Sequence, residues 1–122
     1  MPTEQRASIR ASVARGLDAL KTPEPISLPD WANKHFYLSA ESSQAQKRWE
    51  SYPYQIGMLM AMGDDHIEEV TIKKSARIGY TKCLLAAIAY FAQHKRRNQC
   101  IWQPTDADSD EFCKAEVEPM LR

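Results

Sequence analysis

Apolar residues near the N-terminus recur at the spacing of an α-helix. Separations of four, four and three residues relate Ile9, Val13, Leu17 and Leu20. They therefore predict a helix over residues 3–20 with a single apolar stripe. The stripe either packs on the chain's own domain, which the pattern alone favours, or docks on a partner subunit.

Three prolines follow this helix, at Pro23, Pro25 and Pro29. Proline removes a backbone donor and clashes inside a helix, so the segment is expected to be an extended connector. We therefore expect two parts: residues 1–27, an amphipathic helix with a proline-rich linker, and residues 28–122, a folded domain.

Within residues 28–122, segments with the apolar spacing of a helix alternate with short segments typical of strands. Helices are expected from about residue 28, with Pro29 in the first turn, and over 49–62, 81–94 and 106–121. The β-branched and apolar stretches 69–73 and 98–103 predict strands, and 39–46 reads as irregular. The aromatic residues expected to anchor the start of the domain are Trp31, Phe36 and Tyr37. The side chains expected on one side of the 49–62 helix are Tyr54, Met58, Leu59 and Met62.

A strand, an almost wholly apolar helix and a second strand within about 35 residues match the size of a βαβ unit. Its strands are expected to be parallel and its crossover right-handed. The predicted fold class is therefore α/β, with a parallel sheet preceded by an N-terminal helical arm.

The turn between the first strand and the apolar helix carries the candidate chemistry. It reads Lys74-Ser75-Ala76-Arg77-Ile78-Gly79-Tyr80-Thr81-Lys82. A phosphate-binding loop needs glycine where a Cβ would intrude, a helix N-terminus, a cation, and a hydroxyl for Mg²⁺. Gly79 and Thr81 match two positions of the common pattern, whereas Lys74 replaces its first glycine and Tyr80 its lysine. From the residues alone, phosphate binding and an ordinary basic turn remain equally good readings.

Composition narrows the partners and the compartment. Sixteen basic and sixteen acidic residues cancel, so a strongly basic footprint for nucleic acid is missing. The cluster Lys95-Arg96-Arg97 suits a helix C-terminus, with a DNA phosphate contact as the alternative. Three cysteines without paired spacing read as reduced thiols, and Cys83 as a core residue. Without a signal peptide or a membrane-length apolar run, the chain is expected to be soluble and intracellular.

The turn resembles the deviant Walker A loop of lambda-type phage terminase large subunits, in which a cation lies early in the loop. Other short motifs fall in family order: Tyr37-Leu38, Glu41-Ser42-Ser43, Arg48-Trp49-Glu50, Pro53-Tyr54-Gln55, Ala61-Met62-Gly63, His94-Lys95 with Arg97-Asn98, Pro104-Thr105-Asp106 and Val117-Glu118-Pro119. The resemblance covers roughly residues 28–122. It implies a P-loop NTPase fold and an ATPase that translocates double-stranded viral DNA into an empty procapsid.

The resemblance also assigns roles to the residues of the turn. Lys74 and Arg77 would act catalytically on the phosphates of ATP, and Thr81 would bind Mg²⁺. The nucleotide-binding residues would be Lys74, Ser75, Gly79, Tyr80, Thr81, Lys82, Gln55 and Tyr54. Gln55 matches the family's glutamine near the adenine, but the family's tyrosine after Glu41-Ser42-Ser43 is Gln44 here, which cannot stack on a purine in the same way. Tyr54 is either its substitute or a core aromatic.

Further implied partners are the terminase small subunit, the procapsid portal and other copies of the large subunit, with no membrane. The sequence to Arg122 contains neither an apolar run ending in Asp-Glu (Walker B) nor nuclease carboxylates. It therefore reads as an incomplete fold, truncated before Walker B, that binds nucleotide weakly. The alternative is a non-catalytic interaction module for the small subunit, bound through the 9–20 stripe. A helicase-type motor is disfavoured by the Arg48-Trp49 and Pro104-Thr105-Asp106 motifs.

Overall fold

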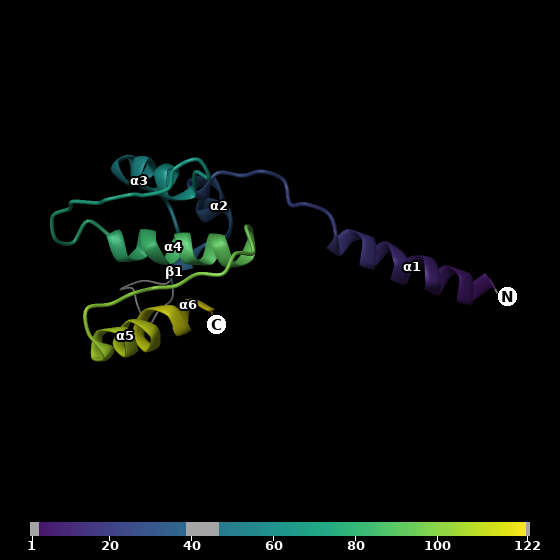
Figure 1. Cartoon of the computed structure of the whole chain (residues 1–122). Coiled ribbons are helices and arrows are strands. Elements are labelled where there is room, and N and C mark those ends of the chain that lie inside the picture. Colours follow the sequence, from purple (N-terminus) through teal and green to yellow (C-terminus); the bar gives the residue numbers. More distant parts are fainter. Residues whose placement is uncertain (1–2, 39–46, 122) are drawn as a thin grey trace.

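The computed structural model describes residues 3–38 and 47–121 (Figure 1). The elements are α1 (Thr3–Ala19), α2 (Leu28–His35), β1 (Tyr37–Leu38), β2 (Lys47–Arg48), α3 (Pro53–Gly63), α4 (Tyr80–Gln93), α5 (Asp106–Phe112), the π-helical turn η1 (Cys113–Val117) and α6 (Glu118–Leu121). The expected irregular segment 39–46, including the Glu41-Ser42-Ser43 motif and Gln44, lies outside the described residues.

The N-terminal helix is confirmed as α1, but its stripe does not pack on the domain. The helix projects away from the other elements at the end of an extended connector (Figure 1). Ile9, Val13 and Leu17 are 50%, 54% and 59% exposed. The expectation that this stripe is covered by the chain's own domain is therefore wrong.

The domain starts with a capped helix. The Ser27 hydroxyl accepts a hydrogen bond from the Asp30 backbone N–H, and Pro29 lies in the first turn of α2 as expected. Trp31 and Phe36 are buried, whereas Tyr37 is 59% exposed. Because successive side chains of a strand point to opposite faces, burial of Phe36 turns Tyr37 outward. Tyr37 is thus not an anchor.

Helices α2, α3 and α4 pack against one another and enclose the core. Its largest fully buried side chains are Leu28, Leu59, Gln55, Cys83, Leu85 and Tyr90. The Tyr90 hydroxyl, within this core, donates a 2.8 Å hydrogen bond to the Ile26 carbonyl. This bond ties the connector to the middle of α4.

Helix α3 begins at Pro53, later than expected, and most of its expected inner face is confirmed, since Met58, Leu59 and Met62 pack on the core. Trp49 lies before the helix and is buried, and its indole N–H donates to the Ser51 hydroxyl at 2.8 Å. Leu59 is fully buried, but Tyr54 is 58% exposed and Gln55 takes its place inside. The positions of α2 and α4 place Gln55 inside instead of Tyr54, and periodicity alone did not identify this exchange.

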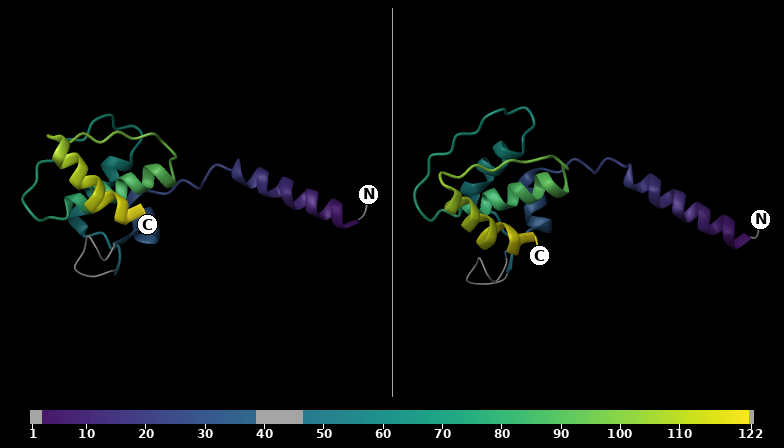
Figure 2. Two further views of the ribbon diagram at one scale, coloured as in Figure 1. Left: turned by 90° about the horizontal axis from the view of Figure 1, so that it is seen from below. Right: turned by 60° about the horizontal axis from the view of Figure 1, so that its bottom comes forward.

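The two predicted strands are extended segments without strand pairing in the described chain. Residues 69–73 and 98–103 both run along α4 (Figures 1 and 2), and Gln99 Nε2 donates to the Ile88 carbonyl at 2.9 Å. The one described sheet is a short antiparallel pair, with Tyr37 opposite Arg48. A strand exists only through a partner's hydrogen bonds, and β-branched composition supplies none. The parallel sheet therefore stays a prediction.

The C-terminal helix is interrupted. Thr105 caps α5, its hydroxyl accepting from the Asp108 N–H at 3.1 Å. The expected single helix over 106–121 instead widens into η1 and continues as α6. Phe112, Val117 and Met120 pack this segment against the core. Among the helices of the described ranges, none is both long and apolar enough to cross a bilayer.

Candidate functional site

The turn of residues 74–82 leads from the extended 69–73 segment directly into α4. Gly79 is the N-cap of α4, with φ +80° and ψ 20°, in the left-handed region. Arg77 also has positive φ, at 59°. A Cβ on Gly79 would lie 2.8 Å from Gln55 Nε2. Both the backbone angle and the packing therefore require glycine at the position where the loop pattern predicts it.

Two side chains of α3 hold this turn through a single carbonyl. The Ile78 carbonyl accepts hydrogen bonds from the Tyr54 hydroxyl at 3.2 Å and from Gln55 Nε2 at 3.1 Å. Gln55 Oε1 in turn accepts from the Tyr52 backbone N–H at 3.1 Å. The buried Gln55 side chain thus links the start of α3 to the turn by hydrogen bonds. Both predicted adenine contacts, Tyr54 and Gln55, therefore contact the backbone of the turn.

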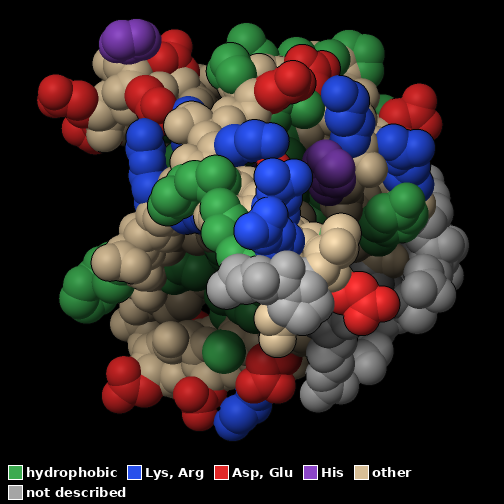
Figure 3. Space-filling model, turned by 90° about the vertical axis from the view of Figure 1, so that its right-hand side faces the viewer, with side chains coloured by type: hydrophobic (Ala, Val, Ile, Leu, Met, Phe, Trp, Pro, Cys, Tyr) green, Lys and Arg blue, Asp and Glu red, His purple; other side chains and the backbone are tan. Residues whose placement is uncertain are grey.

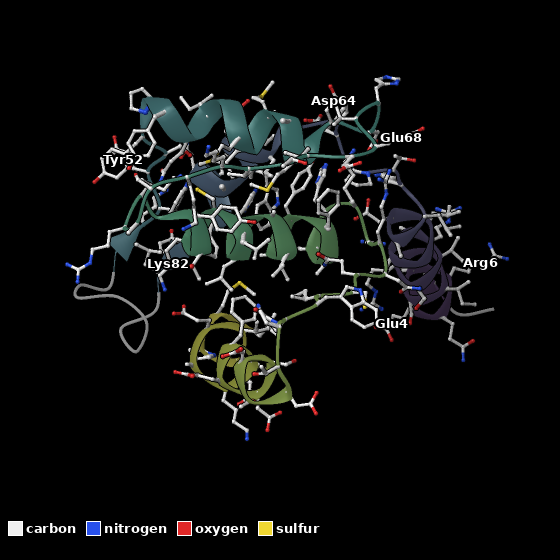
Figure 4. The ribbon with its side chains drawn as sticks, turned by 60° about the vertical axis from the view of Figure 1, so that its left-hand side comes forward. Glu4, Arg6, Tyr52, Asp64, Glu68 and Lys82 are labelled. Carbon is white, nitrogen blue, oxygen red and sulfur yellow. The ribbon has the colours of Figure 1, made fainter. Side chains whose placement is uncertain are left out.

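A cavity of about 450 Å³ lies beside the turn. Its walls include Tyr52, Tyr54, Gln55, Arg77, Gly79 and Lys82. The Tyr52 and Tyr54 rings are nearly parallel, 3° apart, with centroids at 5.7 Å. In Figure 4, Tyr52 and Lys82 lie at the same end of the α3–α4 pair. The volume and the mixture of aromatic and cationic walls are typical of a small-molecule site.

The loop cations have different surroundings. Lys74 Nζ lies 5.6 Å from the centroid of the Tyr80 ring, within cation–π range. Lys82 Nζ forms an ion pair with Glu116 at 2.7 Å. Arg77 is exposed and borders the cavity. Positive charge therefore surrounds the turn on several sides, although the usual lysine position holds Tyr80.

Thr81, the expected magnesium ligand, borders a second cavity. This space of about 410 Å³ has walls that include Thr81, Gln103, Pro104, Asp108, Glu111 and Glu116. Lys82 borders the first cavity and is bonded to a residue of the second. Lys74, Ser75 and Tyr80 lie in the turn and are not among the residues that line either cavity.

Sequence reasoning missed two neighbours of the site. Tyr52 is next to the recognised Pro53-Tyr54-Gln55 motif, so its aromatic side chain was a usable signal. Glu116 is 34 residues from Lys82 in the sequence, and nothing in the pattern connects the two. Only the packing of the C-terminal helices below α4 brings them together.

The basic cluster after α4 is largely engaged within the chain. Lys95 Nζ and Arg97 Nη1 each lie 2.9 Å from a carboxylate oxygen of Asp65. Hydrogen bonds from Lys95 and then Arg97 hold the pKa of Asp65 below its ordinary value, and Asp65 raises the pKa of Lys95. Arg96 is exposed with φ 51°. The cluster therefore clamps the segment after α3 to the end of α4.

The face of the described residues that Figure 3 shows is mixed in charge. On the side of the molecule from which α1 projects, acidic, basic and hydrophobic side chains all occur on the same face (Figure 3). This mixture agrees with the formal net charge of +0.

A family model and two relatives of this chain all point to the same protein family. The model of the phage terminase large subunit gpA ATPase domain matches residues 42–122. The terminase large subunit of Enterobacteria phage P21 is 46% identical over 119 residues, covering 98% of this chain and 18% of the relative. That of Escherichia phage lambda is 47% identical over 114 residues, covering 93% of this chain and 18% of the relative. Protein TfaD of Escherichia coli K12 is 58% identical over 41 residues, 34% of this chain and 22% of TfaD. No solved structure matches.

Proposed function

The chain belongs to the family of phage terminase large subunits with a gpA-type ATPase domain, and on that premise we propose that it forms the ATP-binding part of a motor that packages double-stranded viral DNA into the procapsid. It spans 18% of the length of the P21 and lambda relatives, so the activity of the whole protein is part of the proposal. The proposed setting is the host cytoplasm, with further copies of the subunit, the small subunit and the portal as partners.

One observation carries the nucleotide site. Gly79 has a left-handed backbone at the start of the 14-residue helix α4, beside a 450 Å³ cavity, and the Gln55 amide holds the preceding carbonyl. The first backbone N–H groups of a helix have no partner within it and favour anions. A phosphate at this helix start is thus within the chemistry that the turn offers. We propose accordingly that the fold is of the P-loop α/β class.

The residues fit a magnesium–nucleotide complex in kind. We propose that Lys74 and Arg77 balance the charge of the terminal phosphates and that Thr81 supplies the hydroxyl ligand of Mg²⁺ from the first turn of α4. Bound Mg²⁺ would neutralise negative charge on the phosphates. Tyr54 and Gln55 border the cavity in which the adenine base would lie. Lys82 would add a further positive charge beside the phosphates. Ser75 and Tyr80 would contact the nucleotide from within the turn.

Binding of a fluorescent, non-hydrolysable ATP analogue with Mg²⁺ tests this proposal on residues 1–122. Lys74→Ala removes a cation from the turn and is expected to raise the Kd about tenfold, the typical weight of a hydrogen bond to a charged group. Lys73→Ala, which removes an exposed lysine from the neighbouring extended segment, is the matched control and should bind as the unaltered chain does. Absence of binding by the unaltered chain contradicts the nucleotide site, and equal Kd values for the two variants contradict the role of Lys74.

The exposed stripe of α1 favours a second function, as an interaction module for the terminase small subunit. Exposed apolar side chains at helical spacing suit a partner's groove. A pull-down with the small subunit compares two double variants. One combines Ile9→Ser and Val13→Ser on the apolar stripe. The other combines Ala7→Ser and Ala11→Ser on the opposite face of the same helix. Only the first pair should reduce capture, and equal capture by both pairs contradicts this function.

A further inference from the structure

The ion pair between Lys82 and Glu116 joins the turn to the C-terminal helices. Lys82 Nζ lies 2.7 Å from Glu116 Oε2, and the two side chains are 19% and 27% exposed. Within the described parts of the chain, no other hydrogen bond or ion pair connects residues 105–121 to the rest. The remaining attachment is apolar, through Phe112, Val117 and Met120.

The pair also links a wall of one cavity to a wall of another. Lys82 is a wall of the cavity beside Gly79, whereas Glu116 is a wall of the cavity beside Thr81. Lys82 therefore borders the cavity beside the proposed phosphate site, while its ammonium group is paired with a carboxylate. A phosphate group carries more negative charge than one carboxylate and competes for the same donor.

Glu116 lies where the C-terminal helix departs from regular α-helical geometry. It belongs to η1, the π-helical turn Cys113–Val117 between α5 and α6. Such turns often occur at functional sites, because their wider hydrogen-bond ring interrupts the regular helix. Release of Glu116 would therefore alter a segment whose helical order is already interrupted.

We propose that Glu116 is a positioning residue that holds Lys82 when nucleotide is absent, and that a bound triphosphate takes its place. This exchange would release the α5–η1–α6 segment from the start of α4 and so convert nucleotide binding into a movement of the C-terminal helices. The inference rests on the proposed nucleotide site and adds to it a carboxylate that competes with the phosphates.

The affinity test compares Glu116→Gln with Glu111→Gln. Glu111 borders the same cavity and makes no ion pair among the described residues, so its variant removes the same charge without freeing Lys82. Glu116→Gln should lower the Kd for the Mg²⁺–ATP analogue, and for inorganic triphosphate, about two- to fivefold. Glu111→Gln should change it much less. Duplex DNA is included as another source of phosphate, and a gain with DNA alone overturns the proposal.

Hydrogen exchange in the unaltered chain provides a measurement that does not depend on how well the variants fold. Amides of residues 113–121 of the unaltered chain should exchange faster when the ATP analogue is bound than when it is absent. In the Glu116→Gln variant without nucleotide, they should exchange as fast as in the analogue-bound unaltered chain. Binding of the analogue with no such change, or with equal Kd values for Glu116→Gln and the unaltered chain, overturns the exchange and leaves the nucleotide site standing. Absence of binding by the unaltered chain and by both variants refutes both.

Discussion

At Gly79 the chain passes through the left-handed region immediately before α4 begins. Gly79→Ala should lower the free energy of unfolding by about 1–2 kcal/mol, because L-residues are strained there and the new Cβ would press on Gln55. Gly57→Ala is the matched control, since it lies inside α3 with nothing within 4 Å of a new Cβ. That control should raise stability by up to about 1 kcal/mol. Urea unfolding measures both, and similar shifts in the same direction would contradict the strained role of Gly79.

The buried amide of Gln55 links α3 to the turn. Gln55→Leu still fills most of the buried space. It leaves the Tyr52 N–H without its acceptor and the Ile78 carbonyl without one of its donors. We expect a loss of about 1–3 kcal/mol in the free energy of unfolding, the usual penalty for a buried polar group left unsatisfied. Tyr54→Phe removes the exposed donor to the same carbonyl and should cost no more than about 0.5 kcal/mol. A larger effect at Tyr54 than at Gln55 would reverse this assignment.

At the scale of elements, α1 contributes surface rather than core. None of its described residues is buried, so a chain that starts at residue 22 should keep the urea midpoint of the longer chain. Leu28→Ala, by contrast, truncates a side chain that is only 1% exposed and leaves a cavity in the core. It should lower the free energy of unfolding by about 2–5 kcal/mol. A large drop in the midpoint on removing residues 1–21 would indicate that α1 packs on the domain after all.

Helix α4 is covered on the side that carries Cys83. The thiol is fully buried, and burial raises its pKa to about 11, whereas Cys100 and Cys113 are exposed. Because the thiolate is the reactive form, a thiol-reactive dye at pH 8 should label two cysteines of the folded chain rapidly and the third only after unfolding. Mass spectrometry of the labelled peptides checks which two react. Rapid labelling of Cys83 would mean that α4 opens readily.

At the scale of the whole molecule, Asp65 joins the segment after α3 to the end of α4 through Lys95 and Arg97. Its pKa in the folded state is below the ordinary 3.8, so its contribution to stability is fully present above that value and is lost as the pH falls through the folded pKa. Asp65→Asn should therefore lower the unfolding midpoint at pH 6, and the difference from the unaltered chain should shrink as the pH falls below 3.8.

Salt separates this ion pairing from other acid effects. At about 1 M salt the screening length falls to ~3 Å, so the difference caused by Asp65→Asn should shrink at pH 6. Asp64→Asn is the control: its carboxylate accepts from the His66 N–H and is in no ion pair of the described side chains. A pH-independent difference at Asp65 would mean that the ion pairs contribute nothing.

Local chemistry could be predicted where it depends on neighbours in the sequence. The apolar period gave α1 and α4 within one residue at each end, Pro29 and Thr105 marked helix starts, and the apolar run around Cys83 indicated its burial. At the site, the turn and its glycine could be predicted, because φ > 0 and a helix start both have signals in the residues themselves.

The remainder depends on contacts between segments far apart in the chain. The burial of Gln55 instead of Tyr54, the exposure of the α1 stripe, and the pairing of Lys82 with Glu116 follow from which elements lie against each other. Pairing also decides whether a β-branched segment becomes a strand, since its hydrogen bonds need a partner backbone. By itself the sequence determined α1, α4, the turn between residues 74 and 82, and the family. The tertiary structure decided which side chains face the turn, because burial and ion pairing belong to surfaces brought together by packing.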